Sequence, residues 1–437
     1  QQSGGSIGVN DAPAFTANGT AERAGDTYTF TASASDINED DGDSLTVSAD
    51  LQYYGTLALS NNGDGTYSAT LDLSDLIDRG GTRTVTFSAT DSVGAPATGD
   101  AGTASFFVDY VGGADMDEPA DASGVPGNRT ITFTITNSGN ADDIYTVSAS
   151  SFAGWSLSHP ATVSVAHASS ASFDLIVTVP FVAMGVMDEL DVAIASQNDG
   201  TATDAHTMTY TVAQEYGVVV TAITGTQEGA PDSSTSHTFQ VQNTGNGADT
   251  FAISTSGSWS SSASSISLEL IMGQVALVTV THDVPAGAAH GDSDTVTLNA
   301  VGGASGSDSA ESSAGLVTGS SITLGTVSVA YPGDSFQISG TVTNTGNGYA
   351  TYSFGISGNS EANGWAVLNT TSTDVLAAGG SFDFRVWINV PEDTPAGSSY
   401  SISVATDDDS ASATLGIASD ARSAGVSAAD GSFLLHP

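Results

Sequence analysis

The sequence contains no cysteine and no lysine, and each absence excludes a way of stabilising a fold. Without thiols the chain can form neither a disulfide framework nor a thiolate metal site. Without lysine it cannot form Lys–Asn isopeptide crosslinks. We therefore expect the folded chain to be held together by burial of apolar side chains, by bound ions or by neighbouring molecules.

Cationic side chains are also scarce, because 49 Asp and Glu residues stand against six arginines and the formal net charge is −43. Nucleic acids and anionic lipid headgroups are bound through Lys and Arg, so a surface of this composition repels both. We predict no nucleic-acid partner. The same surface attracts divalent cations, although a well-solvated secreted surface would have the same composition.

Long hydrophobic runs are absent too, since no apolar run reaches the ~18 residues that a membrane span requires. We expect no direct membrane insertion. The opening residues QQSGGSIGV are typical of a mature end after removal of a signal peptide. Three Asn-X-Ser/Thr triplets, at Asn18, Asn128 and Asn369, are candidate glycosylation sites. These features predict an extracellular protein of the cell surface.

One phrase occurs three times, about a hundred residues apart: ITNSGNADD from Ile135, VQNTGNGAD from Val241 and VTNTGNGYA from Val342. A tryptophan follows each copy, and a Val-Pro pair then ends an apolar stretch. The tryptophans are Trp155, Trp259 and Trp365, and the prolines are Pro180, Pro285 and Pro391. Landmarks in a constant order at near-constant spacing indicate an internal repeat.

Alternating polar and apolar residues flank each phrase, as in ITFTITN before the end of the first copy and IYTVSAS after it. Asn and Gly favour tight turns, so we interpret the phrase as the tip of a β-hairpin. The tryptophan is expected to cap a core between two sheets, and the proline to end a strand. About seven short strands per hundred residues are typical of an antiparallel immunoglobulin-type sandwich. The predicted fold is all-β, with tandem immunoglobulin-like β-sandwiches arranged as an elongated rod.

The repeated order of strand, N-x-G-N turn, strand, Trp and apolar Val-Pro strand resembles the CARDB-like modules of archaeal and bacterial surface proteins. The first hundred residues, with NDAP, an acidic ASD…DGD loop and SATD, resemble bacterial cadherin-like modules of dystroglycan type. These resemblances imply an N-terminal segment at 1–8, a cadherin-like sandwich at 9–111, CARDB-like repeats at 112–213, 214–316 and 317–417, and a C-terminal tail at 418–437.

The acidic stretch DINEDDGD at residues 36–43 is the best candidate site. Calcium takes six to eight oxygen ligands, which closely spaced Asp and Asn side chains beside a permissive Gly supply. The candidate ligands in this loop are Asp36, Asn38, Asp40 and Asp43. The resemblance to cadherin-like modules implies that Asp11 and Asp91 converge on the same end of the sandwich. Calcium is therefore a predicted cofactor, and a solvated acidic loop is the alternative.

Other acidic residues carry weaker hypotheses. A second cluster follows the first module and comprises Asp115, Asp117, Glu118 and Asp121. It is interpreted either as a calcium-stiffened joint or as an ordinary acidic linker. The acidic residues at the repeated turns are interpreted as solvated hairpin tips, namely Asp142, Asp143 and Asp249.

Catalytic chemistry is not indicated by the sequence. The histidines are scattered, and the pairs His159/His167 and His282/His290 fall in or near expected loops, which argues against a zinc site. No G-x-S-x-G, H-E-x-x-H or P-loop motif occurs. We therefore predict that the chain is not an enzyme.

The predicted function is that of a structural subunit of an extracellular assembly, such as a filament, surface layer or sheath. Self-association into a polymer is expected, with the apolar SFLL of the C-terminal tail as a possible donor strand for a neighbouring subunit. The alternatives are an adhesin or stalk that presents a surface to glycans or other surface proteins, and accessory modules of a secreted hydrolase.

Overall fold

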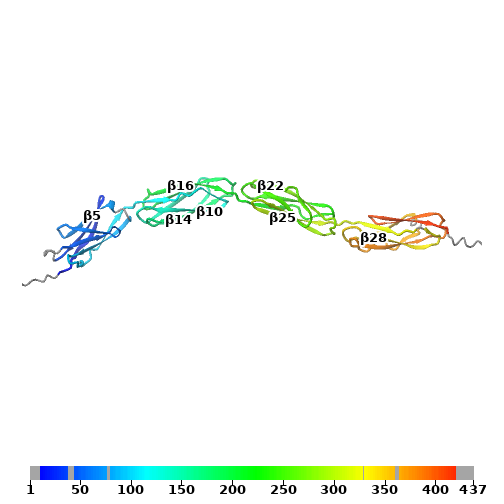
Figure 1. The fold of residues 1–437 in the computed structure, drawn as a ribbon, viewed down its shortest axis with the longest axis horizontal. Helices are drawn as coiled ribbons and strands as arrows, with labels where there is room; N and C mark the ends of the chain where they lie inside the picture. Colours follow the sequence, from blue (N-terminus) through cyan, green and yellow to red (C-terminus); the bar gives the residue numbers. More distant parts are fainter. Residues whose placement is uncertain (1–9, 38–43, 76–78, 328, 360–363, 420–437) are drawn as a thin grey trace, which may run out of the picture. The chain divides into compact units, whose positions relative to one another are not determined.

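The computed structural model describes residues 10–37, 44–75, 79–327, 329–359 and 364–419. In this part of the chain the regular structure consists of short strands, with brief 3-10 turns at Gln52–Tyr54 and Leu73–Asp75. The chain forms two compact units, Gln1–Glu215 and Tyr216–Pro437. Each unit contains two β-sandwiches, which are called the first to the fourth in chain order (Figure 1).

The first sandwich consists of β1 (Ala14–Ala24), β2 (Thr27–Ser35), β3 (Thr46–Asp50), β4 (Thr56–Asn61), β5 (Thr66–Asp72), β6 (Gly81–Thr90) and β7 (Thr103–Val108). Their order is β1-β2-β5-β4-β3-β6-β7. The short pairing of β4 with β5, at Ser60↔Ser68 and Asn61↔Tyr67, joins the two layers. Aromatic rings fill the space between the layers, with Phe30 packed edge-on against Phe106 at 5.4 Å.

The second sandwich has a four-stranded and a five-stranded sheet. The four-stranded sheet has the order β12 (Ser156–Ser158), β14 (Ser170–Val179), β10 (Gly127–Asn137), β8 (Ala114–Met116). The five-stranded sheet has the order β13 (Thr162–Val165), β11 (Asp143–Ser151), β15 (Met187–Ser196), β16 (Thr203–Val212), β9 (Ala122–Gly124). Alternation places every second side chain of β14 in the core, as Phe173, Leu175, Val177 and Val179.

The third sandwich repeats this plan. One sheet has the order β17 (Val218–Ala222), β19 (Ser234–Asn243), β23 (Val275–Asp283), β21 (Ser261–Ala263). The other has the order β18 (Gln227–Gly229), β25 (Ser305–Ala314), β24 (Ser293–Val301), β20 (Asp249–Ser256), β22 (Ser267–Leu270).

Within its described residues the fourth sandwich follows the same order with one strand fewer. Its sheets are β26 (Ser320–Leu324), β28 (Ser335–Asn344), β31 (Ser381–Asn389), β30 (Ala366–Leu368), and β27 (Val329–Ala330), β33 (Ser410–Ile417), β32 (Ser399–Ala405), β29 (Gly355–Ser357). The prediction of tandem immunoglobulin-like β-sandwiches is thus confirmed. The expected strand end before each Val-Pro pair is also seen, because β14 ends at Val179 and β31 ends at Asn389.

The prediction that each repeated phrase forms the tip of a β-hairpin is wrong. The strands on either side of the first copy, β10 and β11, lie in different sheets, and the same holds for β19 and β20 and for β28 and β29. The phrase is therefore a corner that carries the chain from one sheet to the other. Alternation shows which side of a strand is buried but not which sheet the strand joins, and both layers here alternate in the same way.

The sheets are also not wholly antiparallel. In each repeat a short early strand pairs parallel with the last strand: β9 with β16, β18 with β25, and β27 with β33. These early strands have two or three residues each, too few for an alternation pattern to reveal them.

Candidate functional site

The predicted calcium loop is only partly within the described residues. Asn38, Asp40 and Asp43 lie outside them. Asp36 directly follows β2 and is buried, while Asp11 precedes β1 and is exposed. Among the described residues no group of three or more Asp, Glu or His side chains is placed to hold a metal ion. The calcium site therefore stays a prediction that depends on the 38–43 segment.

Asp91 organises the turn that follows β6. Its Oδ1 accepts hydrogen bonds from the backbone N–H groups of Val93 (3.0 Å) and Ala95 (2.7 Å). Its Oδ2 accepts one from the side-chain amide of Asn10 (2.7 Å), next to Asp11. The bond from Asn10 and then the backbone donors lower the pKa of Asp91, because they stabilise the ionised carboxylate. The entry segment and the SATD turn therefore meet through the bond between Asn10 and Asp91, while the convergence of Asp11 and Asp91 on a calcium ion stays a prediction.

The second acidic cluster is dispersed over both sheets of the second sandwich. Asp117 accepts a hydrogen bond from the backbone N–H of Thr134 on β10, whereas Asp121 accepts one from Thr209 on β16 at 2.8 Å. Both carboxylates therefore serve as anchors for the segment between β8 and β9. The interpretation of Asp143 as part of a solvated hairpin tip is wrong. Asp143 is buried and accepts a hydrogen bond from the Ser196 hydroxyl.

The first asparagine of each repeated phrase is buried, and its side chain hydrogen-bonds across the two sheets of its sandwich. In the second sandwich Asn137 Oδ1 accepts from the N–H of Gly139 (2.9 Å), and its Nδ2 donates to the carbonyls of Ala141 (2.8 Å) and Val165 (3.1 Å). Val165 belongs to β13 in the opposite sheet. Asn243 and Asn344 make the corresponding three bonds.

The second asparagine of the phrase binds the linker that precedes its own sandwich. In the first unit Asn140 Oδ1 accepts from the N–H of Val111 at 2.9 Å, and Nδ2 donates to the carbonyl of Asp109 at 2.9 Å. The backbone of Asn140 also donates to Val111 (3.0 Å) and accepts from Gly80 (2.7 Å) in the first sandwich. One residue thereby fixes the linker and the neighbouring sandwich.

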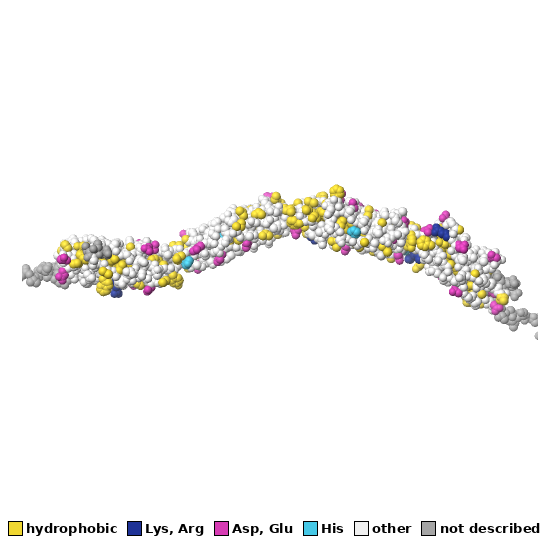
Figure 2. Space-filling model, turned by 180° about the vertical axis from the view of Figure 1, so that it is seen from behind, with side chains coloured by type: hydrophobic (Ala, Val, Ile, Leu, Met, Phe, Trp, Pro, Cys, Tyr) yellow, Lys and Arg dark blue, Asp and Glu magenta, His cyan; other side chains and the backbone are white. Residues whose placement is uncertain are grey.

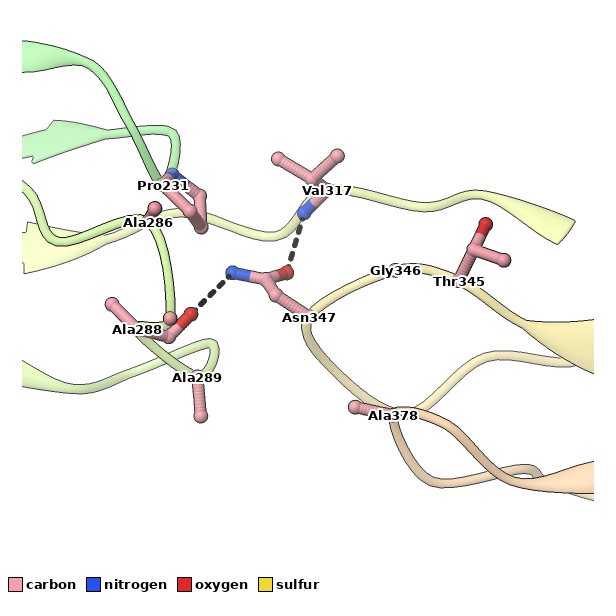
Figure 3. Close-up of a pocket in the computed structure, with 10 residues that line it drawn as sticks. Pro231, Ala286, Ala288, Ala289, Val317, Thr345, Gly346, Asn347 and Ala378 are labelled. Carbon is pink, nitrogen blue, oxygen red and sulfur yellow. Dashed lines mark hydrogen bonds between the residues drawn. The ribbon is translucent and has the colours of Figure 1, made fainter.

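Asn347 makes the corresponding bonds in the second unit and one more, to Ala288; Figure 3 draws its bonds to Val317 and Ala288. Its Oδ1 accepts from the N–H of Val317 at 2.8 Å, and Nδ2 donates to the carbonyls of Gly315 (2.8 Å) and Ala288 (3.3 Å). Its backbone carbonyl accepts from the N–H of His290 at 2.9 Å. Ala288 and His290 belong to a loop of the third sandwich, so Asn347 again joins adjacent sandwiches.

The glycine between the two asparagines lets the linker approach. A Cβ on Gly139 would lie 2.7 Å from the carbonyl oxygen of Val111, and a Cβ on Gly346 would overlap the carbonyl oxygen of Val317. Carbon and oxygen cannot approach so closely, so a side chain here would displace the linker. The N-x-G-N pattern therefore encodes a junction between sandwiches as well as a corner within one.

A buried polar network that sequence reasoning missed lies in the third sandwich. The Ser312 hydroxyl oxygen is 2.8 Å from His237 Nε2, 2.9 Å from His282 Nδ1 and 2.7 Å from Thr235 Oγ1. His282 Nε2 is 3.2 Å from Asp294 Oδ2. Both histidines and Ser312 are fully buried. His282 therefore lies on β23 within the core, and not in or near a loop as predicted.

One pattern of hydrogen-bond donors and acceptors connects the two histidines through Ser312. An ionised Asp294 only accepts, so His282 donates from Nε2, and its Nδ1 accepts from the Ser312 hydroxyl. Ser312 Oγ in turn accepts from His237 Nε2–H, and His237 Nδ1 accepts from the hydroxyl of Thr224 at 3.3 Å. Burial, and next the neighbouring His282, lower the pKa of His237. Burial by itself would raise the pKa of Asp294, but the bonds from Trp259 and His282 outweigh it and lower that pKa.

The sister sandwiches have apolar side chains at the histidine positions. His237 precedes the phrase where Ile131 and Ile338 stand, and His282 precedes the Val-Pro pair where Val177 and Ile388 stand. The arrangement of Ser312, His282 and Asp294 resembles a nucleophilic triad, but a fully buried hydroxyl cannot meet a substrate. The alternation of HTFQVQN, with Phe239 and Val241 in the core, was the signal that placed His237 inside.

The three glycosylation candidates are accessible. Asn18 on β1, Asn128 on β10 and Asn369 after β30 are all exposed. The side-chain oxygen of Asn128 accepts from the hydroxyl of Thr178 at 2.9 Å, and that of Asn369 accepts from the N–H of Arg385 at 2.7 Å. Modification at these positions stays a prediction. Across the described residues no helix has the length and apolar character needed to cross a membrane.

Comparison with protein-family models supports the class of fold. A family model described as Bacterial Ig domain matches residues 10–103, and no curated protein matches the chain. Similar solved structures include an I-band fragment of titin, I67–I69, with 12% identity over 71% of this chain and 99% of that chain, at a TM-score of 0.29. The Escherichia coli adhesin FdeC has 18% identity over 67% of this chain and 94% of that chain, at a TM-score of 0.32.

A third similar structure is PcdhgB3 EC1-4, with 11% identity over 94% of this chain and 97% of that chain, at a TM-score of 0.38. The family match and the strand order of the four sandwiches together define a protein built of tandem immunoglobulin-like domains. The finer resemblances to dystroglycan-type and CARDB-like modules stay predictions.

Proposed function

We propose that this chain is a structural protein of the extracellular surface, in which immunoglobulin-like sandwiches act as stiffly joined spacers within a larger assembly. The observation that carries the proposal is the asparagine bracket, because Asn140 and Asn347 bind linker and neighbouring sandwich through the same set of bonds in both units. Fixed joints transmit force and hold spacing, which is a mechanical role. The surface location rests on the composition and on the bacterial Ig match.

Each joint combines backbone and side-chain bonds, and this is the reason to expect stiffness. Joints between domains are usually mobile unless the interface is extensive. Here Asn140 is buried and Asn347 is half-buried, and each side-chain bond lost would take a partner from a backbone group of the linker. We therefore propose that the domain boundaries predicted at 111/112 and 316/317 mark rigid joints and not flexible hinges.

The absence of cysteine permits a clean test of joint stiffness. Cysteines introduced at exposed positions Thr250 and Ser399 would carry spin labels in the third and fourth sandwiches of the full chain. We expect a narrow distance distribution by electron paramagnetic resonance, which broadens in Asn347→Ala. Asn389→Ala, at an exposed position on β31, is the matched control and should leave the distribution narrow. A broad distribution in the unaltered chain would refute the spacer role.

Self-association is the second part of the proposal. Residues 420–437 of the tail lie outside the described residues, so the donor-strand hypothesis for SFLL rests on the sequence. Electron microscopy of the purified chain is expected to show polymers, and deletion of residues 418–437 is expected to leave separate molecules. Polymers that persist after the deletion would exclude the tail as connector, and lone molecules throughout would favour the adhesin or stalk alternative.

A further inference from the structure

Two of the six arginines share one surface pocket, although the other described arginines are dispersed. Arg23 forms a salt bridge with Asp109 at 2.9 Å. Arg129 donates to the carbonyls of Val125 and Pro126, and Arg385 donates to the side chain of Gln337. Figure 2 shows how few dark-blue cationic side chains lie among the magenta carboxylates on the face in view. Two cations in one place are therefore a conspicuous feature of this chain.

The pocket lies in the first unit, where the first sandwich meets the corner phrase of the second, and has a volume of about 270 Å³. Its lining comprises Tyr53, Arg79, Gly80, Arg83, Tyr110, Asn140, Ala141, Asp142 and His167. This is close to the lower end of the ~300–1,000 Å³ range of small-molecule pockets, which is room for about one sugar ring. The asparagine bracket of Asn140 fixes the two sides of the pocket relative to each other.

The two guanidinium groups have different tasks. Arg83 is held by the backbone, since its Nε donates to the carbonyl of Arg79 at 2.8 Å and its Nη2 to that of Gly80 at 2.7 Å. Arg79 is exposed, and its guanidinium lies 4.9 Å from the centre of the Tyr53 ring. Within the described part of the chain neither arginine forms a salt bridge with a carboxylate. Arg79 therefore offers its planar donors toward solvent, in the form that pairs with a carboxylate.

The opposite side of the pocket accepts hydrogen bonds. Asp142 uses Oδ1 to accept from the N–H of His167 at 2.8 Å, and His167 Nδ1 lies 2.8 Å from the carbonyl of Gly139. His167 Nδ1 must donate to that carbonyl, so in the neutral ring Nε2 is an acceptor. A simple inorganic anion would be repelled by Asp142. A ligand that carries both a carboxylate and hydroxyl groups would satisfy both sides.

We propose that this arginine–tyrosine pocket binds a carboxylated sugar, with the carboxylate on Arg79 and the hydroxyl groups on Asp142 and His167. The charge of the Arg83 guanidinium adds to the positive potential, and the exposed Tyr53 ring positions both guanidinium groups, with Arg79 at 4.9 Å and Arg83 at 5.6 Å from its centre. Because the rest of the chain is strongly acidic, the pocket would take a single acidic residue of a glycan and not an extended polyanion.

The test uses the full chain with D-glucuronate, D-glucose and sulfate as probes, followed by ligand-observed nuclear magnetic resonance and calorimetry. Glucuronate is expected to bind, glucose to bind at least about tenfold more weakly, and sulfate not to compete. Arg79→Gln should weaken glucuronate binding by about tenfold or more, and Arg79→Lys should restore part of it. Arg385→Gln, another exposed arginine, is the matched control and should bind as the unaltered chain does.

Three results would overturn the proposal: no glucuronate binding, equal binding of glucuronate and glucose, or binding that Arg79→Gln leaves unchanged. Sulfate that competes as well as glucuronate would define a plain anion site and equally exclude the sugar acid. The thermal unfolding midpoint of Arg79→Gln should match that of Arg385→Gln, which separates loss of a ligand group from loss of the fold. Raising the salt concentration should weaken binding, since the contact is charge-assisted and exposed.

Discussion

At the scale of single residues, the two asparagines of the repeated phrase have different structural roles. The first asparagine is buried between the sheets and ties the corner to the strand opposite, whereas the second leaves its own sandwich and holds the linker. Both uses depend on an amide that donates and accepts at once. Aspartate, which only accepts when ionised, could not replace either one.

Loss of the inner asparagine should destabilise its sandwich. In Asn344→Ala the carbonyls of Gly348 and Leu376 and the N–H of Gly346 lose their partners, at a cost of about 2–4 kcal/mol in the free energy of unfolding. Asn389→Ala at an exposed site should change it by about 0.5 kcal/mol or less. Urea unfolding of the two variants measures the difference in the free energy of unfolding. Equal values would contradict the role of Asn344 in joining the two sheets.

The histidine network predicts acid sensitivity of the third sandwich. The pKa of His237 is lower in the folded chain than the ~6.5 of an unfolded histidine, so the folded state binds this proton less tightly. The stability that depends on neutral His237 is therefore fully present above pH ~6.5. It is lost as the pH falls from ~6.5 toward the folded pKa, and the free energy of unfolding decreases by at most ~1.4 kcal/mol per pH unit for one proton. Hydrogen exchange of β23 amides from pH 7.5 to 5 measures the loss.

The comparison variant for acid sensitivity places the sister residues in the third sandwich, as His237→Ile, His282→Val and Ser312→Leu combined. It removes His237, its neighbour His282 and the hydroxyl that both histidines contact. If this variant folds, hydrogen exchange of its β23 amides should change with pH only as the intrinsic exchange rate of an unfolded amide does. His237→Gln alone, which keeps a polar side chain, should lose most of the dependence. An unaltered pH profile in His237→Gln would contradict the assignment.

At the scale of elements, the corner phrase connects strand pairing within a sandwich to the joint with its neighbour. The glycine of the phrase lies both in the corner between the two sheets and in contact with the linker of the joint. In the second unit Gly346 lies against the carbonyl of Val317, and Asn347 binds the N–H of the same residue. A change of one methyl group here alters a joint and not a core.

Gly346→Ala should therefore open the joint while leaving the core of the fourth sandwich intact. Displacing the linker costs about 1–3 kcal/mol, as overpacking usually does. The amide of Val317 should exchange with solvent at least tenfold faster, whereas amides of β31 should not change. Gly287→Ala is the control in the facing loop, because a Cβ there meets nothing within 4 Å. Slow exchange of Val317 in Gly346→Ala would show that the linker is held in another way.

At the scale of the whole molecule, charge dominates the physical behaviour. With −43 formal charges, the chain repels other copies at low salt, so any assembly needs screening or bound cations. Calcium bound at the predicted acidic loop 36–43 of the first sandwich, whose first residue Asp36 is buried, would meet this need.

Calcium is expected to stabilise the first sandwich by mass action, with about 2.7 kcal/mol at a free concentration a hundred times the dissociation constant. Calorimetric titration and thermal unfolding with and without calcium measure binding and stabilisation. Asp40→Asn combined with Asp43→Asn should abolish both effects, whereas Asp383→Asn on β31 of the fourth sandwich should abolish neither. Unchanged binding in the loop variant would place calcium elsewhere on the acidic surface.

The sequence alone determined the longer strands, because alternation and the Val-Pro and Asn-Gly signals are local. Strand β14 and the turn at Asn137 were thus predictable, as was the number of repeats. Tertiary structure decided which sheet each strand joined, because pairing of β10 with β14 and of β11 with β15 depends on residues far apart in the chain. The same long-range pairing buried Asp143, joined His237 to Ser312 and gathered Arg79 and His167 around one pocket. No local sequence pattern predicts these contacts, because each depends on how strands that are distant in the sequence pack together.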